Sequence, residues 1–118
     1  MKIDQQAVFV IGAGSWGTAI ASVLSSKGIT TYLWDIDSDH ITNLKNDREN
    51  KKYLPGYYFN EHVHPQKDFK KTIGEFSTIC MVVPSHGFRA VFKEIVPLLS
   101  DGTNIVSAVK GIENETCM

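Results

Sequence analysis

Apolar residues follow two different spacings along this chain. Short runs rich in Val, Ile and aromatic residues, typical of strands, cover residues 8–11, 30–35, 77–84 and 104–109. Apolar residues at helical spacing cover residues 15–27, 37–50 and 85–99. Strands that alternate with helices indicate an α/β fold, because parallel strands need a crossover between them.

The predicted fold class is α/β, a Rossmann-type doubly wound parallel sheet with three αβα layers. The run of residues 77–84 is almost entirely apolar, as in strands that are buried on both faces. Pro97 is expected to kink or restart the last helix, and Asp68 to cap a short helix through Ile73. Residues 51–68 are predicted to form an irregular packed loop near the ligand face, because Pro and Gly interrupt them too often for a regular element.

Gly12, Gly14 and Gly17 form the spacing G-x-G-x-x-G between the first strand and the first helix. Gly12 lets the chain turn sharply, Gly14 lets the backbone approach a pyrophosphate, and Gly17 lets the helix pack against its strand. The N–H groups and the positive dipole end of the helix then face the anion. Many loops contain this spacing, but the flanking strand and helix favour a dinucleotide site over a plain turn.

Asp35 ends the second predicted strand, 18 positions after Gly17. A carboxylate there can accept hydrogen bonds from the adenosine ribose of a dinucleotide. It also repels the 2′-phosphate of NADP, so it favours NAD. The alternative is that Asp35 only begins a turn with Asp37 and Ser38, both suitable N-caps for the next helix.

Several candidate residues follow the carboxyl ends of predicted strands: Gly12 to Gly17, Asp35, residues 84–86 and Lys110. In an open parallel sheet these ends line one edge, where ligands bind at the switch in strand order. Hydride transfer to a carbonyl builds negative charge on oxygen, which calls for a fixed positive group. Lys110 is the best candidate for that group, and an ordinary surface lysine is the alternative.

Ser85 and His86 begin the last predicted helix. The ordinary pKa of histidine suits His86 to general acid chemistry, but a place at the helix start fits its position better. Ser85 is expected to cap the helix, since the nucleophile elbow G-x-S-x-G of hydrolases is absent.

Length and charge narrow the class of protein. The chain has 118 residues, the size of one domain with a single core. Its 12 Lys and Arg residues balance 13 Asp and Glu residues, so no electrostatic footprint for nucleic acid or an anionic membrane is present. No apolar run reaches the ~20 residues of a membrane span, and the N-terminus has no signal-peptide profile. A cytoplasmic protein that binds a small molecule is expected.

The cysteines and histidines give no sign of a metal site. Cys80 and Cys117 lack metal or CxxC spacing and are expected to be reduced thiols, with Cys80 a small buried hydrophobe. His62 and His64 would share one face of a short strand, but two histidines alone form an incomplete site. His40 lies on a polar helix and is expected at the surface.

A set of motifs resembles one known family. The motifs are GAGSWGTA at residues 12–19, Leu33-Trp34, Leu54-Pro55, Val83-Pro84-Ser85-His86 with Phe88, and Lys110-Gly111-Ile112-Glu113. In this order and spacing they are similar to the bacterial NAD(P)-dependent glycerol-3-phosphate dehydrogenases, over essentially the whole chain. The resemblance implies reversible reduction of dihydroxyacetone phosphate to sn-glycerol 3-phosphate, which feeds phospholipid synthesis.

The same resemblance implies roles for individual residues. Ser15 and Trp16 look like cofactor contacts in the phosphate loop, Pro84 and Phe88 resemble residues beside the cofactor, and Lys110 resembles a lysine that touches both cofactor and substrate. The substrate would be a phosphorylated small molecule. A homodimer of the full-length protein stays open.

Two features depart from the family pattern. Many bacterial members carry a basic residue, suited to a 2′-phosphate, two positions after the tryptophan of the second strand. This chain has Ile36 there, beside Asp35, so NAD is favoured and NADP stays open. The family also continues into a helical substrate domain with the proton-transfer lysine, whereas this chain stops at Met118. Residues 1–118 are thus expected to be the dinucleotide-binding part of a longer enzyme, inactive alone.

Two other functions stay open at this point. The first is another Rossmann dehydrogenase, such as one for 3-hydroxyacyl or hydroxy-acid substrates, against which the motifs at residues 83–86 and 110–111 argue. The second is a non-catalytic NAD-sensing module that reports to a partner. The sensor hypothesis predicts that the natural protein ends near residue 118, and the enzyme hypothesis predicts a longer protein.

Overall fold

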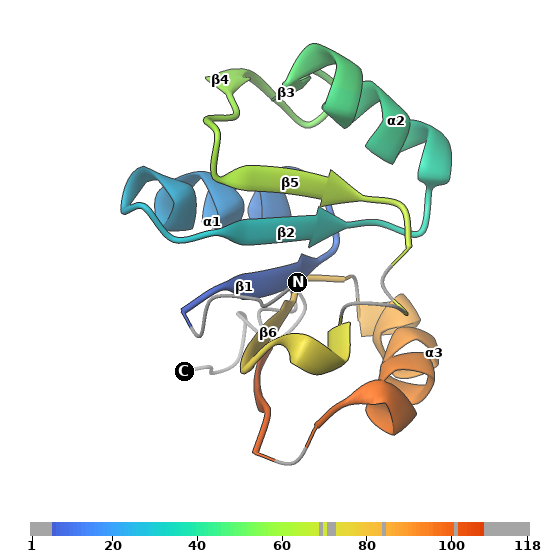
Figure 1. Ribbon diagram of the computed structural model, residues 1–118. Coiled ribbons are helices and arrows are strands. Elements are labelled where there is room, and N and C mark those ends of the chain that lie inside the picture. Colours follow the sequence, from blue (N-terminus) through green and yellow to red (C-terminus); the bar gives the residue numbers. More distant parts are fainter. Residues whose placement is uncertain (1–5, 69, 71–72, 84, 101, 108–118) are drawn as a thin grey trace.

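The structure is a computed structural model that describes residues 6–68, 70, 73–83, 85–100 and 102–107. At its centre is a five-stranded parallel sheet in the order β5-β2-β1-β6-β7 (Figure 1). The strands are β1 (Val8–Ile11), β2 (Thr31–Trp34), β5 (Val63–Gln66), β6 (Thr78–Met81) and β7 (Asn104–Ser107). The chain runs outward from β1 to β5 and then from β6 to β7, so the strand order switches between β1 and β6.

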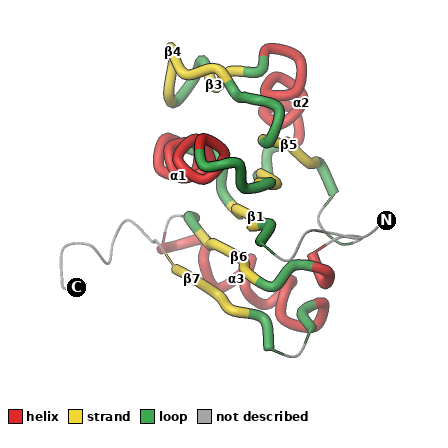
Figure 2. The backbone as a smooth tube through the Cα atoms, turned by 60° about the vertical axis from the view of Figure 1, so that its left-hand side comes forward, coloured by secondary structure: helices red, strands yellow, loops and turns green. Residues whose placement is uncertain are grey.

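Helices cover both faces of this sheet (Figure 2). One face carries α1 (Ser15–Ser26) and α2 (Ser38–Asp47), and the other carries α3 (Ser85–Ile95) with the 3-10 turns η1 (Ile73–Glu75) and η2 (Val96–Leu98). The predicted Rossmann-type doubly wound sheet with three layers is confirmed. The predicted break at Pro97 is also confirmed, because α3 ends at Ile95 and η2 follows.

The side chains of β1 alternate between two hydrophobic cores. Val8 and Val10 point into the core beneath α1 and α2, and Phe9 and Ile11 point into the core beneath α3. The ring of Phe9 meets that of Phe76 edge to face, with centroids 5.1 Å apart. All of β1 is buried, which explains why this strand appears in the sequence as an unbroken apolar run.

Residues 51–68 are more regular than the predicted loop. They contain β4 (Leu54–Tyr58), which pairs antiparallel with β3 (Glu49–Asn50), and the edge strand β5. The prediction was wrong because Pro and Gly were taken to exclude strands. Pro55 and Gly56 lie in β4, the exposed strand of a small two-stranded sheet, and Pro65 lies in an edge strand, where a missing N–H is tolerated.

The outer edge of β5 is covered by the preceding chain. Val63 N donates to Asn60 O at 3.2 Å, and Arg48 Nη2 donates to Val63 O at 2.9 Å. Pro65 is the next residue whose N would face outward, and it has no N–H. Arg48 ends α2 in left-handed backbone, with φ 55°, so the helix predicted over residues 37–50 stops at Asp47.

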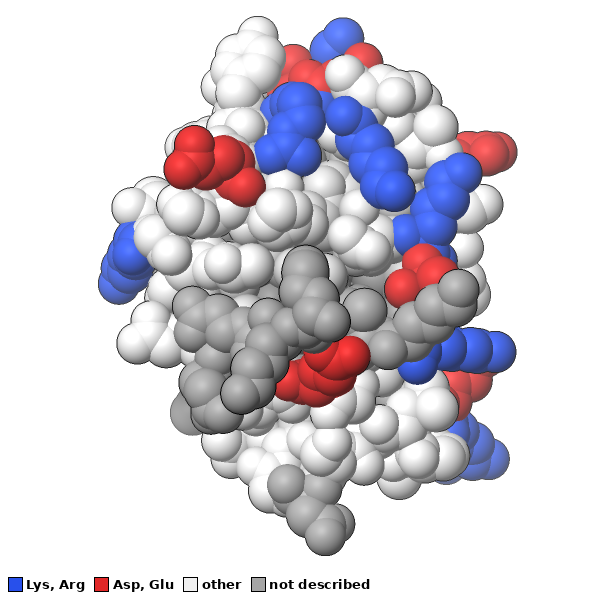
Figure 3. Space-filling view, in the orientation of Figure 1, with Lys and Arg blue, Asp and Glu red and all other residues white. Residues whose placement is uncertain are grey.

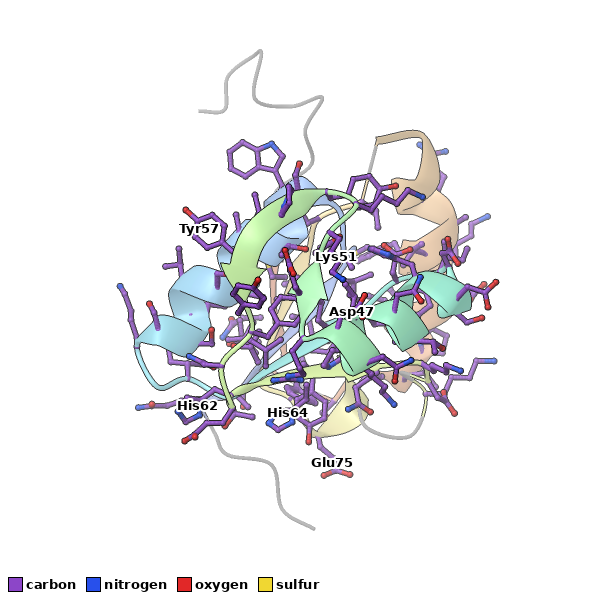
Figure 4. All side chains as sticks on the ribbon, turned by 90° about the horizontal axis from the view of Figure 1, so that it is seen from above. Asp47, Lys51, Tyr57, His62, His64 and Glu75 are labelled. Carbon is purple, nitrogen blue, oxygen red and sulfur yellow. The ribbon has the colours of Figure 1, made fainter. Side chains whose placement is uncertain are left out.

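His64 lies half-buried in β5, with its ring centroid 5.2 Å from that of Tyr32. Burial first, and then the positive charges of Arg48 and His62, hold its pKa below the ordinary value. His62 and His64 lie on the same side of the molecule (Figure 4). The part of the chain that the structure describes holds no group of three His, Cys, Asp or Glu residues that could bind a metal.

We expect the free energy of unfolding to fall as the pH drops through about 6.5, because His64 takes up a proton in the unfolded chain before it does in the folded one. The loss levels off below the pKa of folded His64. His64→Gln should flatten this part of the curve, measured by urea unfolding from about pH 7.5 to about pH 5. Parallel curves for the two proteins would contradict the assignment.

Candidate functional site

The glycine turn (residues 12–17) lies where the strand order switches between β1 and β6, and its glycines differ in their surroundings. Gly12 has a φ of +113°, and a Cβ there would lie 2.4 Å from Val82 O. A Cβ on Gly17 would lie 1.7 Å from Gly12 O, whereas one on Gly14 would meet nothing within 4 Å. The predicted sharp turn at Gly12 and the close helix packing at Gly17 are therefore confirmed. The approach of a pyrophosphate to Gly14 stays a prediction.

The N-terminus of α1 lies at the glycine turn and is open to solvent at Gly14. Gly14 is its N-cap residue, with no side-chain hydrogen bond to the cap and no acidic residue in the first turn. The first turn of α1 carries Ser15 and Trp16, both exposed, and Trp16 retains 51% of its surface. This end of the helix thus has backbone N–H groups and the positive end of the helix dipole. No carboxylate in the first turn neutralises that positive end.

Asp35 follows β2 directly and binds the glycine turn. Its Oδ2 accepts a hydrogen bond from Ala13 N at 2.7 Å, and its Oδ1 accepts one from Asp37 N at 3.0 Å. Asp37 in turn caps α2 by accepting a hydrogen bond from His40 N at 3.1 Å. The predicted turn at Asp35 is therefore present. The ribose contact stays a prediction, and Ile36 beside it is 79% exposed.

A buried polar cluster lies beneath the turn. His40 Nε2 and Asn50 Nδ2 each lie 2.9 Å from Ala13 O, and Asn50 Nδ2 also donates to Thr18 Oγ1 at 2.7 Å. The prediction of His40 at the surface was wrong, because only 7% of it is exposed and its ring bonds to the turn. Asn50 was not identified at all, since no local pattern marks an Asn that acts 37 residues away in the chain.

The third component of the edge is the end of β6. Val82 N donates to Ile11 O at 2.8 Å, which brings this end beside the glycine turn. Pro84 and Lys110 lie outside the described residues, and Ser85, His86 and Phe88 are described only as backbone at the start of α3. The structure therefore joins the glycine turn, Asp35 and the end of β6 into one edge. The roles of these other residues stay predictions.

A cavity of about 440 Å³ lies elsewhere, between α1 and β4. Its lining includes Ser22, Val23, Leu54 and Tyr57, and Figure 4 shows Tyr57 beside α1. These α1 residues belong to the middle and end of the helix, so the cavity is separate from the glycine turn at the helix start.

The surface carries charges of both signs. Acidic and basic side chains are interspersed on the face drawn in Figure 3. None of the described helices has the length and apolar character needed to cross a bilayer.

Cys80 is buried as predicted, and burial raises the pKa of its thiol. Cys117 lies outside the described residues.

Comparison with known proteins identifies the family. The model of the NAD-dependent glycerol-3-phosphate dehydrogenase N-terminus matches residues 7–118. The chain belongs to this family. The match spans nearly the whole sequence, including the glycine turn, Asp35 and the motif at residues 110–113, as the resemblance had indicated.

Individual glycerol-3-phosphate dehydrogenases agree with this assignment. The NAD(P)+ enzyme of Desulfotalea psychrophila is 47% identical over 109 residues, which cover 92% of this chain and 32% of that protein. The enzyme of Shewanella sediminis is 41% identical with the same coverage. The chain therefore spans about a third of the length of these curated relatives.

Solved structures show the same fold. The glycerol-3-phosphate dehydrogenase of Coxiella burnetii superposes with a TM-score of 0.85 at 36% identity, over 91% of this chain and 34% of that one. That of Plasmodium falciparum, at 21% identity, superposes with a TM-score of 0.75 over 86% of this chain and 31% of that one, and supports the fold alone.

The glycine contacts predict that two similar substitutions lower stability to very different extents. Gly17→Ala should lower the free energy of unfolding by about 3 kcal/mol or more, because its methyl group would overlap the carbonyl of Gly12. Gly14→Ala should change it by less than about 1 kcal/mol, since the site is open and the backbone is extended, with φ −82° and ψ −160°. Urea unfolding followed by circular dichroism measures both. Equal losses in the two variants would contradict the packing described for Gly17.

Proposed function

We propose that this chain is the cofactor-binding part of an NAD(P)-dependent glycerol-3-phosphate dehydrogenase, which interconverts dihydroxyacetone phosphate and sn-glycerol 3-phosphate. The observation that carries the proposal is the open glycine turn at the strand switch point, in a chain that belongs to this family. The family assignment also favours this activity over other Rossmann dehydrogenases.

The contacts of a bound dinucleotide follow from this edge. The pyrophosphate would lie against Gly14, Ser15 and the N-terminus of α1, where backbone N–H groups and the helix dipole favour an anion. The adenosine ribose would lie toward Asp35, which is held beside the turn through Ala13. Gly12 and Gly17 make no ligand contact in this proposal but set the path of the turn.

The reacting end of the site would lie beyond β6. When bound, the nicotinamide would supply or accept a hydride. In the direction of reduction, hydride addition to the substrate carbonyl would build negative charge on its oxygen, and we assign the stabilisation of that charge to Lys110, which would contact both cofactor and substrate. Pro84 and Phe88 would flank the cofactor, and Trp16 would contact it from the start of α1. These roles rest on the family motifs.

The whole protein would supply the rest of the site. We propose that a helical substrate domain, with the proton-transfer lysine, completes the enzyme, because the curated relatives are about three times as long as this chain. A cytoplasmic location and a homodimer of the full-length protein are further parts of the proposal. The substrate is then a small phosphorylated ketone or alcohol rather than a polymer.

Titration with NADH tests the proposal directly. The chain should bind NADH weakly. Binding should quench its Trp fluorescence, because half-exposed Trp16 lies beside the turn. Gly14→Val should abolish binding while the protein stays folded, since the larger side chain fills open space that the pyrophosphate needs. The chain alone should show no turnover of dihydroxyacetone phosphate, and the longer gene product should show it. A folded chain that ignores NADH would contradict the proposal.

Cofactor choice gives a second prediction. The unmodified protein should bind NADH more tightly than NADPH, because the carboxylate of Asp35 repels a 2′-phosphate. Ile36→Arg should raise the affinity for NADPH roughly tenfold, since a guanidinium pairs well with a phosphate. Ile36 is 79% exposed, so the substitution should leave folding unchanged. Ile36→Gln is the uncharged control, and calorimetry measures both cofactors. An equal gain in NADH affinity would argue against 2′-phosphate recognition.

A further inference from the structure

Two buried side chains converge on one backbone carbonyl in the glycine turn. His40 Nε2 and Asn50 Nδ2 each lie 2.9 Å from Ala13 O. On the other side of the same residue, Ala13 N donates to Asp35 Oδ2 at 2.7 Å. Side chains from three separate places, the end of β2, α2 and β3, therefore fix both peptide groups of Ala13.

The direction of the Ala13 carbonyl decides where the next N–H points. In a trans peptide the C=O of one residue and the N–H of the next point in opposite directions, and no cis peptide is present among the described residues. Ala13 O is directed inward, toward His40 and Asn50. The N–H of Gly14 is therefore directed outward, at the residue where a Cβ would meet nothing within 4 Å.

The hydrogen bonds of Asn50 allow one orientation of its amide. The side chain is fully buried. Its Nδ2 donates to Ala13 O and to Thr18 Oγ1, and its Oδ1 accepts from Tyr53 N at 3.1 Å. A reversed amide would set its oxygen against the oxygen of Ala13. His40 carries a proton on Nε2 for the same reason, because a carbonyl only accepts.

One donor is enough to satisfy a buried carbonyl, and burying polar side chains is costly. Two buried donors on Ala13 O therefore indicate that its direction matters. Given the proposed dinucleotide function, we propose that Asn50 and His40 are positioning residues. They hold the Ala13–Gly14 peptide so that Gly14 N–H faces the pyrophosphate, and they do not touch the cofactor themselves.

Apolar variants of similar size test this role in the protein. Asn50→Leu and His40→Leu should each weaken NADH binding roughly tenfold or more, measured by calorimetry, because a misdirected N–H no longer bonds to a charged group. His40→Gln can place an amide donor near the position of Nε2 and should recover part of that affinity. If Asn50→Leu does not fold, the comparison of His40→Leu with His40→Gln decides the matter.

Asn60 offers a control away from the glycine turn. Its Nδ2 donates to Ser25 O at 3.0 Å, so it ties the chain after β4 to the far end of α1. Asn60 is exposed, so Asn60→Ser should cost less stability than the Leu variants, and it should leave NADH binding unchanged. The backbone amide resonance of Gly14 should shift when NADH is added to the unmodified protein and to Asn60→Ser. The shift should be much smaller in Asn50→Leu and His40→Leu, an effect specific to the turn.

The outcomes separate this inference from the function on which it rests. If the unmodified protein binds NADH and both Leu variants bind it equally tightly, the positioning role is wrong and the proposed function stands. The positioning role is also wrong if Asn60→Ser loses as much affinity as they do, because the loss then reflects general loosening. If the unmodified protein does not bind NADH, the proposed function fails, and the positioning role fails with it.

Discussion

The start of α1 can lie against the carboxyl end of β1 only because residue 17 has no side chain. A Cβ there would lie 1.7 Å from Gly12 O, well inside the contact distance of the two atoms. This contact sets the first turn of α1 directly above the strand edge, and the chain must turn sharply at Gly12 to reach it. Asp35 and the end of β6 are held beside this turn by hydrogen bonds to Ala13 N and Ile11 O.

The segment from α2 to β4 supports the turn from below. His40 and Asn50 belong to this segment, and both bond to Ala13 O. The same segment is joined to α1 through the bond from Asn50 to Thr18. A part of the chain that contains none of the predicted ligand contacts thus helps to shape the surface that a ligand would meet.

Local patterns in the sequence were enough to predict the alternation of strands and helices, the glycine turn and the position of Asp35. These features depend on neighbours within one strand, one turn or one βαβ unit. The roles of His40 and Asn50 could not be predicted, because their partner lies 27 and 37 residues away in the chain. A short strand around Val63 was expected, but its extension through Pro65 as the edge strand β5 was not, because proline is tolerated only at the edge of a sheet and strand order is not visible in the sequence.

The covered edge of β5 has a consequence for the behaviour of the chain in concentrated solution. An exposed strand edge offers a row of donors and acceptors to which a strand from another molecule can add, and this is a common first step of aggregation. Here Val63 N already donates to Asn60 O, and Val63 O already accepts from Arg48. Pro65 has no N–H to donate. Along β5 no N–H is left for a strand of another molecule, so intermolecular growth of a continuous sheet from this side is disfavoured by groups of the chain itself.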